Sequence, residues 1–223
     1  MTNLSRRRKE VFPVKIISNR EISPQVYILE IEKKIDFKAG QVIGVALQPD
    51  HDLRLYSIAS GTQETTLKIL FDVVLEGELT PHMAQMKSGD TLYMSEPFGR
   101  FTNSPNGSWW IATGTGIAPF AAMAQSGKVE GITLLQGARQ LNQFYFSDLF
   151  KEKMGKRYLR FCTSESHPDV HSGRLTTFLK ESNDLIPTRK YYLCGNSNMV
   201  VEVRDLLLSK GVPFEQIIAE IYF

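Results

Sequence analysis

A glycine-rich turn near the middle of the chain is a candidate site for a phosphorylated ligand. Residues 112–119 read ATGTGIAP and lie between an apolar run and a segment typical of a helix. Backbone N–H groups at such a turn, together with the N-terminus of the following helix, can bind a pyrophosphate. Pro119 stands where the third glycine of a full dinucleotide-binding pattern would be. An ordinary turn that only connects a strand to a helix explains this segment about equally well.

A second group of candidate side chains is the segment RLYS at 54–57. On a strand, alternation puts Arg54 and Tyr56 on one face and Leu55 and Ser57 on the other. A guanidinium offers a planar fork for phosphate oxygens, and a tyrosine ring offers a flat face for stacking on a flavin. An exposed strand with a single ion pair is the alternative interpretation.

Three further segments could contact a ligand. EGELT at 76–80 combines a glycine turn with a hydroxyl at the start of a helix, which suits an anion, although a simple helix cap fits too. CGNSNM at 194–199 follows a strand and opens a helix, although Cys194 by itself is more typical of a small buried residue. The chain ends with AEIYF at 219–223, a strand whose aromatic end packs either on something flat or in the core.

Two different kinds of structure must position these residues. The first half of the chain contains short apolar segments separated by turns, which predict a closed antiparallel barrel of six strands. A single helix in this half is expected to start with Thr80 as its N-cap and to end before Gly89. The expected strands are 11–17, 26–31, 42–47, 53–58, 66–74 and 91–95.

The second half alternates strands and helices after a linker at 102–108 that is dense in turn formers. This alternation predicts a Rossmann-like parallel sheet covered by helices on both faces. The predicted domains are therefore residues 1–104 and 105–223. The expected strands are 108–112, 131–136, 158–162, 190–194 and 217–222, and the expected helices are 119–126, 143–154, 175–181 and 197–210.

Composition narrows the function classes. The 223 residues are 42% hydrophobic and 22% charged, which is ordinary for a soluble globular protein and excludes a disordered chain. A net charge of +2 is too small to indicate nucleic-acid binding. Only Cys162 and Cys194 are present, without a CxxC pair, so neither a metal site nor an iron–sulfur cluster is expected. No apolar run is long enough to cross a bilayer, and no secretory signal is visible, so we expect a cytoplasmic protein.

The order and spacing of these motifs resemble the ferredoxin–NADP(H) reductase family, and most closely its compact bacterial subclass, over about residues 12–223. The subclass features are GELTP at 77–81, GAR at 137–139 and the Ala-Glu-x-Tyr-aromatic ending. The resemblance implies an FAD-binding antiparallel β-barrel of six strands plus one helix, followed by an NADP-binding α/β domain. FAD and NADP(H) are the cofactors it implies.

The resemblance also implies a set of functional residues. For FAD, these are Arg54, Leu55, Tyr56, Ser57, Gly77, Leu79, Thr80, Tyr222 and Phe223. For NADP, they are Gly114, Thr115, Gly116, Arg139, Ser164, Arg174, Gly195 and Met199. The implied catalytic residues are Ser57, Cys194, Glu220 and Tyr222. In the implied roles, Arg54 binds the FAD pyrophosphate, Tyr56 and Tyr222 stack on the two flavin faces, and Ser57 lies near flavin N5. Cys194 and Glu220 lie beside the nicotinamide. Phe223 extends toward the FAD adenine.

The implied reaction moves a hydride between NADP(H) and flavin, and single electrons between flavin and ferredoxin or flavodoxin. A preference for NADP rests on Arg139 and Arg174, whereas Ser164 stands where a third arginine is often found and brings no charge. An NAD(P)H-dependent reductase component that serves an oxygenase or another acceptor is the alternative. A non-catalytic nucleotide-binding or assembly module is the alternative from another class.

Ferredoxins and flavodoxins are acidic, so a basic docking rim is expected. We also expect a monomer or a weak dimer. For any single one of the candidate cations, an ordinary solvated surface position is the favoured interpretation. The candidates are residues 6–9, Lys87, Arg100, Lys151, Lys153, Lys156 and Arg157.

Overall fold

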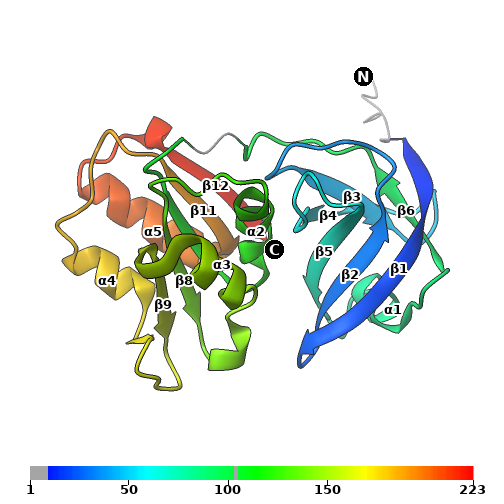
Figure 1. The fold of residues 1–223 in the computed structure, drawn as a ribbon, viewed down its shortest axis with the longest axis horizontal. Helices are drawn as coiled ribbons and strands as arrows, with labels where there is room; N and C mark the ends of the chain where they lie inside the picture. Colours follow the sequence, from blue (N-terminus) through cyan, green and yellow to red (C-terminus); the bar gives the residue numbers. More distant parts are fainter. Residues whose placement is uncertain (1–9, 103–104, 223) are drawn as a thin grey trace, which may run out of the picture.

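The chain folds into two lobes that lie side by side (Figure 1). The computed structural model describes residues 10–102 and 105–222, with Tyr222 described by its backbone alone. The last barrel strand ends at Ser95 and the second sheet begins at Trp109, so the predicted division after residue 104 lies between the two sheets. The predicted fold class, an antiparallel sheet followed by a parallel α/β domain, is confirmed.

The first lobe is a six-stranded antiparallel sheet with the order β4-β3-β6-β1-β2-β5. An antiparallel bridge between Ile58 and Ile69 joins its two edges, which closes the sheet into a barrel. Alternate residues of β1, such as Val14 and Ile16, are buried, which is the period-two pattern of a half-buried strand. The strands are β1 (Val11–Ser23), β2 (Val26–Glu32), β3 (Val42–Ala46), β4 (Arg54–Ser57), β5 (Thr66–Asp72) and β6 (Thr91–Ser95).

The helix α1 (Thr80–Gln85) packs against the barrel through the buried Met83. The side chain of Asn19 donates hydrogen bonds to the carbonyl oxygens of Met83, Ala84 and Met86 at 2.8 to 3.3 Å. These bonds bind carbonyl groups in the last turn of the helix, where the Met83 carbonyl oxygen also accepts the N–H of Met86. A residue of β1 therefore fixes where α1 ends.

The start of α1 differs from the prediction. Leu79 is the N-cap, and Thr80 is already the first helical residue. The Thr80 hydroxyl accepts the backbone N–H of Val74 at 2.8 Å. The predicted N-cap is therefore wrong, because this hydroxyl holds the preceding turn rather than the first turn of the helix.

The second lobe is a parallel sheet with the order β10-β9-β8-β7-β11-β12. The helices α2 and α3 cover one face and α4 and α5 cover the other, and a separate hydrophobic cluster lies beneath each pair. The elements are β7 (Trp109–Thr113), α2 (Ala118–Gln125), β8 (Thr133–Ala138), α3 (Ser147–Met154), β9 (Tyr158–Cys162), β10 (His171–Ser172), α4 (Leu175–Glu181), β11 (Tyr191–Asn196), α5 (Ser197–Ser209) and β12 (Ile217–Tyr222).

Most helices and strands of this lobe lie within two residues of their predicted bounds, and two departures from the prediction are larger. The helix expected over 143–154 is shorter, because Phe146 adopts a left-handed backbone with φ of 58° and α3 begins only after it. A 3-10 turn over Leu141–Gln143 precedes this break and overlaps the expected helix only at Gln143. The strand β10 was not predicted, since two residues are too few to produce a hydrophobic period.

A shared hydrophobic core joins the two lobes. Phe101, at the end of the barrel half, makes edge contacts with Phe120 of α2 and Tyr192 of β11 at ring-centroid distances of 5.5 and 5.2 Å. The Gln125 side chain donates to the carbonyl oxygen of Ala59 at 2.8 Å. These contacts fix the relative position of the barrel and the α/β domain, and with it the geometry of any site between them.

Candidate active site

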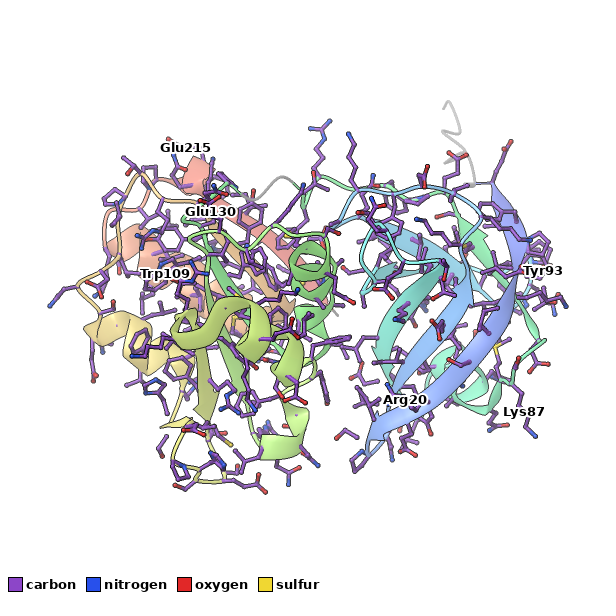
Figure 2. The ribbon with its side chains drawn as sticks, in the orientation of Figure 1. Arg20, Lys87, Tyr93, Trp109, Glu130 and Glu215 are labelled. Atoms are coloured by element: carbon purple, nitrogen blue, oxygen red, sulfur yellow. The ribbon has the colours of Figure 1, made fainter. Side chains whose placement is uncertain are left out.

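The carboxyl edge of the parallel sheet faces away from the labelled residues Trp109, Glu130 and Glu215. These residues lie at or just before the starts of β7, β8 and β12, and so mark the amino edge (Figure 2). The end of β12, where the C-terminus is marked, lies toward the barrel (Figure 1). Ligands of open α/β sheets bind at the carboxyl edge, where the strand order reverses. In this sheet the reversal lies between β7 and β11.

The contact between Ser57 and Glu220 joins the barrel to this edge. Ser57 at the end of β4 is 2% exposed, and its Oγ donates to Glu220 Oε2 at 3.4 Å. Glu220 on β12 is paired in register with Cys194 on β11. The fold therefore brings together three of the four predicted catalytic residues from three separate strands. The side chain of Tyr222, the fourth, and all of Phe223 lie outside the described residues.

Burial shifts the acid–base behaviour of Glu220. Removal from water disfavours the carboxylate and raises the pKa of Glu220 to about 7, while the hydrogen bond from Ser57 acts in the opposite direction. An ordinary glutamate is almost fully ionised at neutral pH. Glu220 can therefore either hold or release a proton close to neutrality, at the point where the two domains meet.

The glycine turn after β7 packs directly on β11. A Cβ atom on Gly116 would lie 2.4 Å from the carbonyl oxygen of Cys194, and one on Gly195 would lie 2.5 Å from Thr113 Oγ1. Gly195 also has a φ of +141°, which side chains rarely adopt. Gly116 and Gly195 thus serve the close approach of two backbone segments, a packing role that the sequence pattern does not reveal.

Gly114 and Thr115 form the open part of the same turn. Gly114 has a φ of +56°, and nothing lies within 4 Å of the position that its Cβ would occupy. Thr115 is half-exposed beside it. The turn then runs into α2, so exposed backbone at this place is suited to a pyrophosphate.

The predicted residues of the ribose phosphate site converge at the other end of the same edge. Ala138 of β8, Cys162 of β9 and Ser172 of β10 are in register across three neighbouring strands. The backbone N–H of Ser164 donates to the carbonyl oxygen of Arg139 at 3.0 Å. Ala138, Cys162 and Ser172 form one row at the carboxyl ends of β8, β9 and β10. One or two residues beyond this row lie Arg139, Ser164 and Arg174.

The segment 54–57 is only partly alternating. Leu55 is 57% exposed and Arg54 is also exposed, whereas Tyr56 packs against the barrel core and Ser57 is buried. Burial, together with the nearby Asp72 carboxylate, raises the pKa of Tyr56 to about 12. Tyr56 therefore remains a neutral phenol throughout the physiological range.

The turn that follows β5 is held by two hydrogen bonds. The N–H of Gly77 donates to the carbonyl oxygen of Val74 at 2.8 Å, and the N–H of Val74 donates to the Thr80 hydroxyl. Leu79 is half-buried against the barrel core. Gly77 and Thr80 therefore stabilise this turn through hydrogen bonds to Val74.

Met199, predicted as a coenzyme contact, is 6% exposed and packs with Val200 and Val203 in the core beneath β11. The side chain of Asn196 caps the same helix, α5, by accepting the N–H of Asn198 at 3.0 Å. The backbone N–H of Asn196 donates to Thr113 Oγ1 at 3.3 Å. Asn196 thus links the start of α5 to the glycine turn, and Met199 packs the same helix into the core.

Two family descriptions match most of the chain. The family described as Oxidoreductase FAD-binding domain matches residues 13–103, and the one described as Oxidoreductase NAD-binding domain matches residues 110–205. The flavodoxin/ferredoxin–NADP reductase of Escherichia coli is 31% identical to this chain over 192 residues, which cover 74% of this chain and 77% of the relative. The chain belongs to the ferredoxin–NADP reductase family. It is thus an oxidoreductase with an FAD-binding and an NAD(P)-binding domain.

The relatives of this chain also include a reductase component of a dioxygenase. Reductase component 1 of terephthalate 1,2-dioxygenase from Comamonas sp is 28% identical to this chain over 232 residues, covering 95% of this chain and 68% of the relative. A ferredoxin NADP+ reductase structure from Neisseria gonorrhoeae, with bound FAD and NADP, has a TM-score of 0.86 at 22% identity, over 96% of this chain and 99% of that one. The second likeness shows that the fold is shared.

The barrel surface of this reductase fits a group that is both apolar and anionic, as FAD is. Leu55, Val74 and Leu75 are 57%, 57% and 73% exposed, so apolar side chains lie open on β4 and on the turn after β5. Arg54 is exposed beside Leu55. A flat ring can cover the apolar side chains while the guanidinium binds phosphate.

Sequence reasoning missed two residues of this reductase site. Gly99 has a φ of +109°, and a Cβ there would lie 3.9 Å from Glu220 Oε1, so a barrel turn borders the carboxylate. Glu202 on α5 forms an ion pair with Arg174, with Nη2 and Oε2 2.6 Å apart. A glycine in a turn was visible in the sequence, but nothing linked Glu202 to an arginine 28 residues earlier.

Two broader properties of the reductase follow from the described residues. No cluster of three or more histidine, cysteine, aspartate or glutamate side chains in residues 10–102 and 105–222 is placed to hold a metal ion. Within the same ranges, every helix is too short or too polar to span a membrane.

Proposed function

We propose that this reductase moves a hydride between NADP(H) and FAD, and single electrons between FAD and ferredoxin or flavodoxin. The observation that carries the proposal is the hydrogen bond between Ser57 and Glu220. It links a strand of the FAD-binding domain to a strand of the NAD(P)-binding domain, beside Cys194. Hydride transfer requires the two redox rings to meet, and this junction is where residues of both domains meet.

In this proposal, strand β4 and the turn after β5 bind FAD on the barrel. Arg54 binds the pyrophosphate, and Gly77, Leu79 and Thr80 form the turn beside it. Tyr56 supplies a neutral aromatic face. When bound, FAD accepts a hydride and passes electrons on one at a time, chemistry that belongs to the cofactor.

Glu220 can exchange a proton at the same junction. Its carboxyl group is close to half-protonated at pH 7, so it can exchange a proton in either direction of the reaction. The Ser57 hydroxyl donates to Glu220 Oε2 and orients the carboxyl group. Glu220 and Cys194 lie on neighbouring strands, where the nicotinamide amide would find both a polar and a small side chain.

The direct test is turnover of the purified yellow protein. Visible flavin absorption and reduction of ferricyanide by NADPH are expected, followed by electron transfer to ferredoxin or flavodoxin. Ser57→Ala lowers turnover, whereas the matched control Ser108→Ala, which removes a buried hydroxyl bonded to Pro105, leaves turnover unchanged. A colourless protein without turnover would support the non-catalytic module instead.

A second candidate function is an NAD(P)H-dependent reductase component for an oxygenase. The relative from the terephthalate dioxygenase system, which matches over 95% of this chain, favours it. The two candidates share the site and differ in the electron acceptor. A comparison of ferredoxin, flavodoxin and an isolated oxygenase as acceptors separates them, since the true partner is reduced at the lowest concentration.

The docking surface for the carrier protein is part of the same proposal. Lys87 lies beside α1 on the barrel, whereas Lys151 and Lys153 lie on α3 of the other lobe (Figure 2). Lys151 pairs with Asp148 at 3.5 Å and Lys153 pairs with Glu152 at 3.4 Å. The basic run 6–9 lies outside the described residues. These cations are spread over two lobes, so we expect only moderate salt dependence of carrier reduction.

The cellular setting and the assembly state complete the proposal. Cys162 and Cys194 are both buried thiols, which supports a reducing compartment such as the cytoplasm. We expect a monomer or a weak dimer. Size-exclusion chromatography at several protein concentrations tests the assembly state.

A further inference from the structure

The strand order defines where each half of the coenzyme lies, if the proposed function holds. Ser57, Glu220 and Cys194 mark the nicotinamide end, next to β11 and β12. The open glycine turn follows β7, in the middle of the sheet. The adenosine half of a dinucleotide that crosses this turn must therefore lie over the ends of β8, β9 and β10.

Two arginines are exposed at that adenosine end. Arg139 follows β8 directly, and Arg174 precedes α4. The backbone N–H of Gly173 donates to the carbonyl oxygen of Cys162 at 2.8 Å, and Cys162 Sγ donates to the carbonyl oxygen of Arg139 at 3.1 Å. One residue thus ties both arginine-bearing segments together. Two guanidinium groups so placed would favour a phosphate on the adenosine ribose.

One carboxylate pairs with one of these arginines, and a second carboxylate is bound to the segment that follows Arg139. Glu202 on α5 pairs with Arg174, with Arg174 Nη2 and Glu202 Oε2 2.6 Å apart. Glu165 follows Ser164, and its Oε2 accepts the N–H of Leu141 at 2.5 Å. The guanidinium that would bind a 2′-phosphate therefore already has an anionic partner. The Arg174–Glu202 pair carries no net formal charge.

We propose that Glu202 is a specificity-determining residue that competes with the coenzyme 2′-phosphate for Arg174. NADPH can bind Arg174 only by displacing or sharing the Glu202 carboxylate, whereas NADH has a 2′-hydroxyl and makes no such demand. Glu202 thereby narrows the preference of this chain for NADPH over NADH. The Glu202 and Arg174 side chains are 41% and 59% exposed, and an ion pair this exposed changes an equilibrium constant by up to about fivefold.

The test compares the FAD-loaded wild-type protein with Glu202→Gln, which keeps the size of the side chain and removes its charge. Calorimetry measures the dissociation constants of adenosine 2′,5′-bisphosphate and of 5′-AMP. We expect the ratio of the two constants to shift toward the bisphosphate by about two- to fivefold. The ratio of kcat/KM for NADPH to that for NADH is expected to rise by the same factor.

Two further variants separate a local effect from a general change in charge. Glu152→Gln removes one negative charge from α3, where Glu152 pairs with Lys153, and is expected to leave both ratios unchanged. The double variant Arg174→Ala with Glu202→Gln is expected to lose the gain of Glu202→Gln. Equal gains in Glu152→Gln and Glu202→Gln, or no gain in Glu202→Gln, would overturn the inference.

The wild-type protein also distinguishes failure of this inference from failure of the proposed function. A protein that neither turns over NADPH or NADH nor binds 5′-AMP overturns the proposed function, and this inference falls with it. A protein that turns over either coenzyme while Glu202→Gln leaves the ratios unchanged overturns this inference alone.

Discussion

Two glutamates at opposite ends of the carboxyl edge of the parallel sheet show how burial decides the role of a carboxyl group. Glu220 lies at the junction of the two domains, where burial raises its pKa to about 7 and a neutral hydroxyl is its hydrogen-bond partner. Glu202 lies on the surface of α5 and pairs with the guanidinium of Arg174. The first is suited to proton exchange, and the second to adjusting the charge that a ligand meets.

The largest expected effect comes from removing the buried carboxyl group. Glu220→Gln keeps the shape of the side chain but cannot exchange a proton, so we expect kcat for carrier reduction to fall by about 100-fold. Steady-state kinetics with NADPH and the identified carrier measure this fall. A loss of the same size in Glu202→Gln would break the distinction between the two glutamates.

A second difference concerns stability against pH. The pKa of Glu220 is about 7 in the folded protein, against an ordinary value of 4.5, so the folded state binds more protons between these values. The contribution of Glu220 to the free energy of unfolding is therefore lost as pH rises from 4.5 to 7. Between about pH 5 and about pH 8, the free energy of unfolding of Glu220→Gln should rise by roughly 2 kcal/mol relative to that of the wild type.

Urea unfolding of both proteins at the two pH values measures this gain. Glu202→Gln serves as the exposed counterpart, and its effect on the free energy of unfolding should stay within about 0.5 kcal/mol at both. A pH-independent difference between wild type and Glu220→Gln would show that the carboxyl group titrates normally in the folded protein.

A third effect concerns the hydrogen bond from Ser57. This bond lowers the pKa of Glu220, so Ser57→Ala is expected to move the pKa further upward. The pH profile of kcat reports the shift through its inflection near neutrality. An inflection that moves to lower pH in Ser57→Ala would contradict the assigned donor and acceptor roles.

The smallest expected effect is that of salt. Raising the ionic strength from about 0.01 to about 0.15 M shortens the screening distance from about 30 to about 8 Å. The exposed adenosine end should respond, and we expect the kcat/KM preference for NADPH over NADH to fall by about twofold. The inflection assigned to Glu220 should stay in place, because buried groups are screened much less.

The sequence was sufficient for much of the fold because both sheets have clear hydrophobic periods. β6, β9, β12 and α4 have the predicted bounds, since apolar periodicity and turn residues agree there. The late start of α3 was not foreseeable. It depends on the left-handed backbone of Phe146, a conformation that phenylalanine normally avoids.

The candidate site was only partly foreseeable, for a similar reason. Motif order identified Ser57, Cys194 and Glu220, and the fold brings them together. Motif order could not show that Gly116 is required by the backbone of β11, since that contact joins distant segments. Nor could it reveal Glu202, whose importance depends entirely on where Arg174 lies in space.

The aromatic contacts of Phe101 with Phe120 and Tyr192 have a consequence for how the molecule unfolds. Phe101 and Phe120 are almost fully buried in one cluster that includes residues of both lobes. Neither lobe can lose its structure without exposing this cluster to water. The barrel and the α/β domain should therefore melt together in a single cooperative transition.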